Sequence, residues 1–297
     1  MRTPLVSIMM PCYNAAASLP FACASLIAQT ATDWECIIVD DGSTDGSVEA
    51  ATTIIDDRFR IHRLSVNRGR GFARQTALNL ANGKYIAMLD ADDWWYPAKM
   101  QVQLEVLESD INIAIISTGM AITDANNTLI GVRARNTDDI PVSTGYFGKL
   151  AMPPLAHAPS MLRSSIAKNF RYDPQFLLAQ DVDYLVRYMS GRMYANINSP
   201  MYAYSEISSA NIQKTVMALG FTRKMFLKHR TNQHLRARYL VATAAAKEVV
   251  YRAASAVGCY DLMIQRRSAP PSNADIQAFT HARNSIQHVL DTRTLAK

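Results

Sequence analysis

Short apolar runs alternate with amphipathic stretches along the first 122 residues. Five of these runs predict buried strands, at 5–10, 35–39, 60–64, 85–89 and 113–122. Between the runs, apolar residues recur at helical spacing, as in Leu19, Cys23 and Leu26, and further helices are expected to end near residues 55, 80 and 108. Strands that alternate with helices across short loops predict an α/β fold with a mainly parallel central sheet covered on both faces.

The pattern changes twice after residue 122. Residues 123–204 carry shorter strand patterns and one helix at 181–189, and we interpret them as the half that receives a second substrate. From residue 205 onward the pattern is helical, first in Leu235, Tyr239 and Val249 and then over 276–289 after two prolines. We therefore expect one domain over 1–204, with a nucleotide-binding-type half at 1–122 and a second half at 123–204, and a helical C-terminal region over 205–297.

Composition and charge narrow the class of protein. With 49% apolar and 19% charged residues, the chain has enough apolar material for a substantial core. No uninterrupted apolar run approaches the roughly 18 to 20 residues that span a bilayer, and the sequence opens without a cleavable signal pattern, so a cytoplasmic location is expected. The net charge of +6 is concentrated in residues 205–297, which hold 14 Lys/Arg against 5 Asp/Glu.

Candidate chemistry is densest in residues 83–97, GKYIAMLDADDWWYP. Asp90, Asp92 and Asp93 follow a buried strand directly, and open α/β sheets bind ligands at the carboxyl ends of their strands. Carboxylates this close repel one another, and hard oxygen ligands suit Mg²⁺ or Mn²⁺. A solvated acidic turn is the alternative for an isolated acidic motif. The two tryptophans and the proline that follow favour the wall of a pocket.

Four motifs occur in a fixed order: PCYN at 11–14, DDGSTD at 40–45, NRGRGFARQ at 67–75 and DADDWW at 90–95. In this order and spacing the chain resembles the inverting family 2 glycosyltransferases, from about residue 5 to residue 109. The resemblance implies a GT-A fold and a metal-dependent enzyme of the hexosyltransferase type. It would move a sugar, with inversion, from a nucleotide diphosphate sugar that we expect to be UDP-linked to a hydroxyl acceptor.

The resemblance also implies donor-binding roles, residue by residue. Pro11 and Tyr13 would line the nucleoside pocket, and Asp41 would pair with the uracil ring. Arg74 would reach the base or the phosphates, and Asp90 would hold the ribose and the metal–diphosphate. From the residues alone, two other interpretations stay open: Asp41 as a helix cap and Arg74 as a solvated residue on a helix face.

The metal and the general base follow in the same way. Asp92 would bind Mn²⁺ or Mg²⁺, and Asp93 would share that role if the acidic motif is read one residue along. In the second half, Asp181 matches the residue that deprotonates the acceptor, although Gln180 replaces the acid that relatives carry before it. The alternative role for Asp181 is that of a dipole partner at a helix N-terminus, and Asp183 is the less favoured base because it points away from the same helix face.

Two further positions are left open. His157 lies in a proline-bounded apolar loop and either contacts the acceptor or is simply hydrogen-bonded in place. Many relatives close over the diphosphate with an Arg and a His near the end of the core, but this chain has YSEIS at 204–208. The diphosphate clamp is therefore unassigned.

The predicted function is a glycosyltransferase of cell-surface polysaccharide or glycolipid synthesis with a glycan or lipid-linked acceptor. The alternatives are a nucleotide-sugar-binding protein without transferase activity and a sugar nucleotidyltransferase. The latter would need a Gly-rich phosphate loop after the first strand, which PCYN does not supply. Basic and apolar residues mixed over 221–238 predict that the protein binds peripherally to the inner face of an anionic membrane. No nucleic-acid partner is expected, because a metal–sugar site has no use for one.

Overall fold

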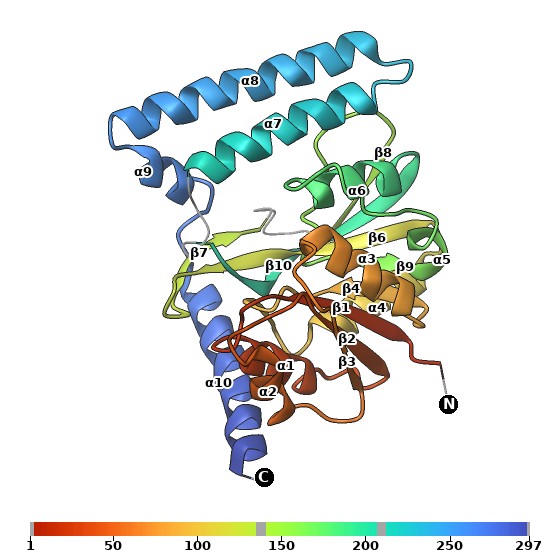
Figure 1. The fold of residues 1–297 in the computed structure, drawn as a ribbon, viewed down its shortest axis with the longest axis vertical. Coiled ribbons are helices and arrows are strands. Elements are labelled where there is room, and N and C mark those ends of the chain that lie inside the picture. Colours follow the sequence, from red (N-terminus) through yellow and green to blue (C-terminus); the bar gives the residue numbers. More distant parts are fainter. Residues whose placement is uncertain (1–2, 135–140, 207–211, 296–297) are drawn as a thin grey trace.

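The computed structural model describes residues 3–134, 141–206 and 212–295, which form helices around one central mixed sheet (Figure 1). The strands of these ranges are β1 (Val6–Cys12), β2 (Trp34–Asp40), β3 (Phe59–Arg63), β4 (Tyr85–Met88), β5 (Trp94–Trp95), β6 (Ile113–Thr123), β7 (Leu129–Arg133), β8 (Val142–Phe147), β9 (Met161–Arg163) and β10 (Arg192–Ser205). The helices are α1 (Leu19–Ile27), α2 (Ser47–Thr52), α3 (Arg70–Leu80), α4 (Lys99–Ser109), α5 (Ser164–Ala167), α6 (Gln180–Met189), α7 (Ile212–Lys228), α8 (His234–Ala256), α9 (Tyr260–Gln265) and α10 (Asn273–Leu295).

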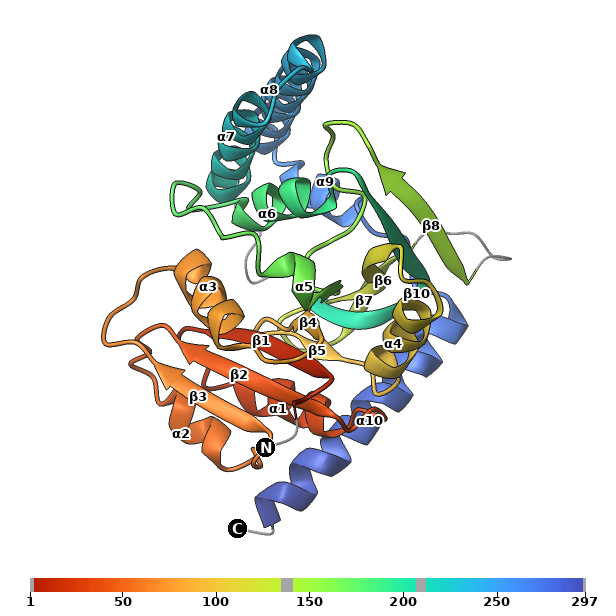
Figure 2. The same cartoon turned by 90° about the vertical axis from the view of Figure 1, so that its right-hand side faces the viewer.

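The N-terminal half contains the parallel part of the sheet. β1 pairs in parallel with β2 on one side and with β4 on the other, and β3 adds in parallel beyond β2. Every residue of β1 is buried, because α1 and α3 lie on opposite faces of this part of the sheet (Figure 2). Since parallel strands end at a common edge, the loops that follow β1, β2 and β4 come together there. The predicted alternation of strands and helices in this half is confirmed.

The second half extends the same sheet with mixed pairing. The short β9 is antiparallel between β4 and β6, and the long β10 runs parallel to β6 and antiparallel to β5 and β8. β5 is formed by the two tryptophans after the acidic motif, which no strand pattern predicted. Tyr202 and Ala203 of β10 pair with them, so the acidic loop is joined at its far end to the second half of the sheet.

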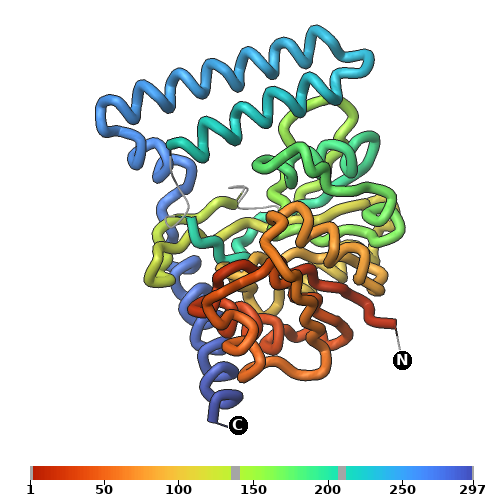
Figure 3. Tube along the Cα trace, viewed as in Figure 1, coloured from red at the N-terminus to blue at the C-terminus, as the bar shows by residue number. Residues whose placement is uncertain are grey.

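The helices after residue 211 have two different surroundings. α7 and α8 form a hairpin on one side of the molecule, whereas α10 runs back along the sheet domain beside α1 (Figure 3). On α10, Phe279, Ala282 and Ile286 are buried in the apolar core on the α1 face of the sheet, and the centroids of the Phe279 and Trp94 rings lie 5.1 Å apart. Residues 273–295 therefore pack with the domain predicted for 1–204, while the hairpin extends away from the sheet. Among the helices of the described ranges, none has the length and apolarity to cross a membrane.

Candidate functional site

A cavity of about 270 Å³ opens where β1, β2 and β4 end. Loops from four segments line it: Pro11, Cys12, Tyr13, Asn14, Ala15 and Ser18 after β1; Asp41 after β2; Asn67, Gly69, Arg70 and Ala73 at the start of α3; and Asp90, Ala91 and Asp92 after β4. Five of the residues predicted to bind the donor or the metal lie in this lining: Pro11, Tyr13, Asp41, Asp90 and Asp92. Two others, Arg74 and Asp93, do not line this cavity.

Asp41 fixes the rim of the cavity. Its carboxylate oxygens accept hydrogen bonds from the backbone N–H groups of Arg68 (2.7 Å) and Gly69 (2.8 Å), so it holds the loop before α3. The loop after β2 approaches closely because Gly42 has no side chain: at its φ of +76°, a Cβ would lie 2.8 Å from the backbone nitrogen of Asn67. Asp41 does not cap α2, whose N-cap is Gly46.

Arg74 and Asp90 form a buried ion pair behind the cavity wall. The Arg74 guanidinium donates to the Asp90 carboxylate at 2.9 and 3.2 Å, and the two side chains are 3% and 12% exposed. Burial opposes the charged form of Asp90, but the charges of Arg74 and Arg70 outweigh it and lower the pKa of this carboxyl. Asp90 is therefore ionised and fixed in position, with Arg74 approaching it from the protein interior.

Asp92 and Asp93 have different environments although they are neighbours in the chain. Asp93 is buried, and its carboxylate accepts hydrogen bonds from the Tyr202 hydroxyl (2.7 Å) and the Ser205 N–H (2.9 Å). This ties the acidic loop to β10. Asp92 is exposed at the mouth of the cavity, where desolvation and the charge of Asp90 raise the pKa of its carboxyl.

Two carboxylates of the cavity, Asp90 and Asp92, are suitable ligands for a hard divalent cation. Asp90 and Asp92 both line one cavity, and desolvation together with the charge of Asp90 raises the pKa of Asp92, so a positive ion would stabilise its carboxylate form. Within the described residues no group of three or more His, Cys, Asp or Glu side chains forms a metal cluster. Mg²⁺ and Mn²⁺ are commonly held by one or two carboxylates together with water and substrate phosphates, and this donor set is compatible with that arrangement.

Asp181 approaches the site from the second half. It lies at the start of α6, half-buried, with one carboxylate oxygen 2.9 Å from the Val182 N–H. Its charge acts on Arg74 together with that of Asp90, so the guanidinium lies within electrostatic reach of both carboxylates. Next to it, Gln180 packs on the first turn of α3. Its carboxamide oxygen lies so close to Gly71 that a Cβ there would be only 3.0 Å away. The start of α6 therefore meets the start of α3 where the two halves join.

The neighbouring Asp183 is bound to other side chains inside the protein and is turned away from the cavity lining. Its side chain is fully buried, forms an ion pair with Arg187 (2.5 Å) and lies 2.7 Å from Nε2 of His229. His157, the other open position, is also buried, and its Nε2 lies 2.9 Å from the Tyr172 hydroxyl. Burial, with the nearby charge of Arg74, lowers the pKa of His157 to about 4, so its ring is neutral at pH 7. In the part of the chain that is described, its Nδ1 has no hydrogen-bond partner.

Sequence reasoning missed Arg70. It is the first residue of α3 and lines the cavity, and its positive charge favours the ionised form of both Asp90 and Asp92. The available signal was Gly69, whose φ of +89° ends the loop and starts the helix at the cavity rim. Of the segment 204–208, where a diphosphate clamp was sought, Glu206 pairs with Arg133, and residues 207–208 lie outside the described ranges.

The chain belongs to glycosyl transferase family 2, because the model of that family matches residues 7–169. An uncharacterised glycosyltransferase of Methanocaldococcus jannaschii is 30% identical over 191 residues, which is 63% of this chain and 65% of that protein. The Escherichia coli protein WfgD, a UDP-Glc:α-D-GlcNAc-diphosphoundecaprenol β-1,3-glucosyltransferase, is 34% identical over 43% of this chain and 49% of its own length. The chain thus spans between about half and two thirds of these two relatives.

Solved structures share the fold. TarS of Staphylococcus aureus, residues 1–349 in complex with UDP-GlcNAc, has a TM-score of 0.58 at 15% identity over 98% of this chain and 92% of its own. The mannosyltransferase PcManGT of Pyrobaculum calidifontis, in complex with GDP-Man and Mn²⁺, has a TM-score of 0.59 at 17% identity over 99% and 88% of the two chains. The predicted GT-A fold and the predicted membership of family 2 are both confirmed.

Proposed function

We propose that this chain transfers a sugar from a UDP-sugar to a hydroxyl acceptor, with inversion and with the help of a divalent cation. The observation that supports it best is the convergence of one cavity and one base. Asp41, Asp90 and Asp92 line a cavity at the carboxyl edge of the sheet. Asp181 comes from the other half, and its charge acts on Arg74, the residue that pairs with Asp90. Donor and acceptor would then meet where α3 and α6 meet.

Asp41 would select the base of the donor. An ionised carboxylate is acceptor-only and has about four lone-pair directions, of which the N–H groups of Arg68 and Gly69 occupy two. The remaining directions suit a base that presents an N–H group, as uracil does at N3, and oppose cytosine, which presents an acceptor there. Pro11 and Tyr13 would form the walls against which the nucleoside lies.

Asp181 would act as the general base. As the acceptor oxygen forms its bond to the sugar C1, the bond from C1 to the diphosphate oxygen breaks and the hydroxyl proton passes to the Asp181 carboxylate. Attack from the face opposite the diphosphate inverts the configuration at C1. A divalent cation held by Asp92, with Asp90 beside it, would neutralise the charge that develops on the departing diphosphate. Arg74 would keep Asp90 ionised and oriented during the transfer.

For the acceptor we propose a glycan or lipid-linked hydroxyl in cell-surface polysaccharide or glycolipid synthesis, at the cytoplasmic face of a membrane. The support is the similarity to WfgD, a glucosyltransferase whose acceptor is a diphosphoundecaprenol-linked sugar. A nucleotide-sugar-binding protein without transfer is the second candidate, favoured by Gln180 in place of an acid. It would bind the donor and release no UDP.

A thermal-shift screen tests the proposal. UDP, UDP-glucose, UDP-GlcNAc, GDP-mannose and CDP are each added with Mn²⁺ or with EDTA. A ligand at 100 times its Kd stabilises the folded state by about 2.7 kcal/mol. At about 2–4 °C per kcal/mol for a chain of this size, the expected shift is about 5–10 °C for uridine nucleotides with Mn²⁺. Equal shifts with CDP, or no shift with any nucleotide, would contradict the donor site, and binding without UDP release in a transfer assay would favour the second candidate.

A further inference from the structure

Helix α8 has an apolar face that no described segment covers. Its inward face contributes buried Ala237, Ala244 and Ala254. On the opposite face, large apolar side chains are exposed along the helix: Leu235 (82%), Tyr239 (67%), Val249 (67%), Val250 (52%) and Val257 (73%). Exposed Ala242, Ala246 and Ala253 fill the spaces between them. The 23 residues of α8 make this apolar face about 35 Å long, at 1.5 Å per residue.

The charges beside this face are all of one sign. Arg236, Arg238, Lys247 and Arg252 are exposed on α8, and its single acidic residue, Glu248, points inward, where it pairs with Arg223 of α7. Arg252 also pairs with Glu248, and no ion pair joins Arg238 or Lys247 to another described residue. The outer face of α8 is therefore apolar along its middle and basic along its borders.

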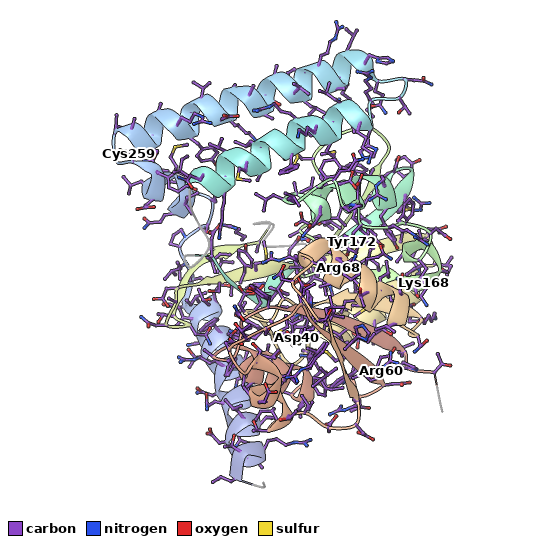
Figure 4. All side chains as sticks on the ribbon, in the orientation of Figure 1. Asp40, Arg60, Arg68, Lys168, Tyr172 and Cys259 are labelled. Carbon is purple, nitrogen blue, oxygen red and sulfur yellow. The ribbon has the colours of Figure 1, made fainter. Side chains whose placement is uncertain are left out.

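Within the basic and apolar stretch 221–238, Leu235, Arg236 and Arg238 belong to this face of α8, whereas the residues of α7 pack against the rest of the protein. Met225 and Phe226 of α7 are buried in the apolar core that α3 and α6 share on one face of the sheet. Arg223 pairs with Glu248, and Lys228 pairs with Asp173. These side chains dock the hairpin onto the domain and each other, so the free apolar surface lies on α8. Figure 1 shows α8 at the edge of the molecule beyond α7, and in Figure 4 side chains stand out from its far side.

We propose that the outer face of α8, from Leu235 to Val257, lies on an anionic lipid surface. An interfacial helix has this composition: an apolar face, basic borders and an aromatic side chain such as Tyr239 that suits the headgroup region. A second copy of the chain fits less well. In a two-fold pair this face would meet itself, and Arg238 and Lys247 would approach the same basic residues with no acidic side chain opposite. Anionic headgroups supply the missing charge.

This proposal rests on the proposed function and gives it a location. A transferase held by α8 on the bilayer would act on acceptors whose carrier lipid lies in the same membrane. It would need no spanning segment, because each basic residue near an anionic surface strengthens binding by about fivefold at low salt.

Vesicle co-sedimentation of the full chain tests it. The vesicles are pure phosphatidylcholine or a mixture with phosphatidylglycerol, at low and high salt. The test variant is Val249→Ser/Val257→Ser, and the matched control is Val66→Ser/Ile111→Ser, whose side chains are similarly exposed (61% and 76%) and lie outside α8. A second test variant, Arg238→Gln/Lys247→Gln, removes two charges.

The wild type and the control should sediment with the anionic vesicles at low salt and much less with the neutral ones. The serine variant should partition about tenfold less and the glutamine variant about 25-fold less at low salt. The proposal is overturned if the wild type stays in the supernatant, or if the serine variant sediments like the control. It is also overturned if light scattering finds a dimer that only the serine variant loses, without vesicle binding. Thermal shifts with UDP and Mn²⁺ on the same samples report separately on the donor site.

Discussion

Removing Arg74 should unfold part of the donor site rather than simply weaken a contact with the nucleotide. Arg74→Met leaves the Asp90 carboxylate buried without its partner, and breaking a buried pair from one side costs about 3–5 kcal/mol. At about 2–4 °C per kcal/mol, the melting temperature should fall by about 6–20 °C. By comparison, Arg60→Met removes the pair with Glu35, in which the Arg60 side chain is 46% exposed, and should cost about 0–1 kcal/mol.

A double-variant cycle separates the two roles that Arg74 can have. Asp90→Asn in the Arg74→Met background removes the uncompensated charge, so the double variant should regain much of the lost stability but not donor binding. Urea denaturation of the four proteins measures the coupling, and Arg74→Lys provides a milder change if Arg74→Met does not fold. If Arg74→Met melts like the wild type and loses only UDP affinity, the argument is refuted and Arg74 contacts the nucleotide.

Three other changes test separate parts of the structure. Asp92→Asn should abolish the Mn²⁺-dependent part of UDP affinity in calorimetry without lowering the melting temperature. In the wild type that part should weaken as the pH falls, because the raised pKa of Asp92 lets protons compete with the cation; equal UDP affinity in EDTA and in Mn²⁺ would contradict both statements. Gly42→Ala should destabilise the chain by at least about 1–2 kcal/mol, since its φ is +76° and the new Cβ would lie 2.8 Å from the backbone nitrogen of Asn67; an unchanged urea midpoint would count against this. Burial lowers the pKa of Lys99, whose Nζ lies 2.7 Å from Gln103 Oε1 and 3.8 Å from the centroid of the Trp95 ring. Between the folded and unfolded pKa values of this group the unfolded chain binds more protons than the folded chain does, so wild-type stability should rise with pH towards the unfolded pKa and Lys99→Met should flatten that dependence. An equal pH dependence of the urea midpoint in the two proteins would count against this.

The sequence predicted well which carboxylates follow the ends of the parallel strands. Asp41, Asp90 and Asp92 follow apolar runs, and the carboxyl ends of parallel strands meet at one edge whatever the details of packing. Side-chain direction on a helix was not predictable in the same way. Arg70 and Arg74 are four residues apart on α3, yet only the first lines the cavity, while the second turns inward to Asp90. The ion pair that decides this is formed between residues 16 positions apart.

Helical periodicity likewise predicted which residues form a helix, but not which side of that helix is buried. Leu235, Tyr239 and Val249 correctly predict a helix, but the face they form is exposed, and the hairpin packs through alanines on the other side. The contact of Phe279 on α10 with Trp94 could not be predicted either, because the two residues are 185 positions apart in the chain. Such long-range packing depends on the whole fold, which a local pattern does not contain.

The transfer step of Asp181→Asn tests the central claim most directly. The change removes the base but leaves the cavity lining untouched, because Asp181 lies outside it. Donor affinity is measured by calorimetry with UDP-sugar and Mn²⁺, and transfer by product formation on a saturating acceptor with the same samples. The account predicts a donor Kd within about twofold of the wild type and a kcat lower by about 10²–10⁴. A kcat near the wild-type value would show that another group removes the acceptor proton, and would contradict the account.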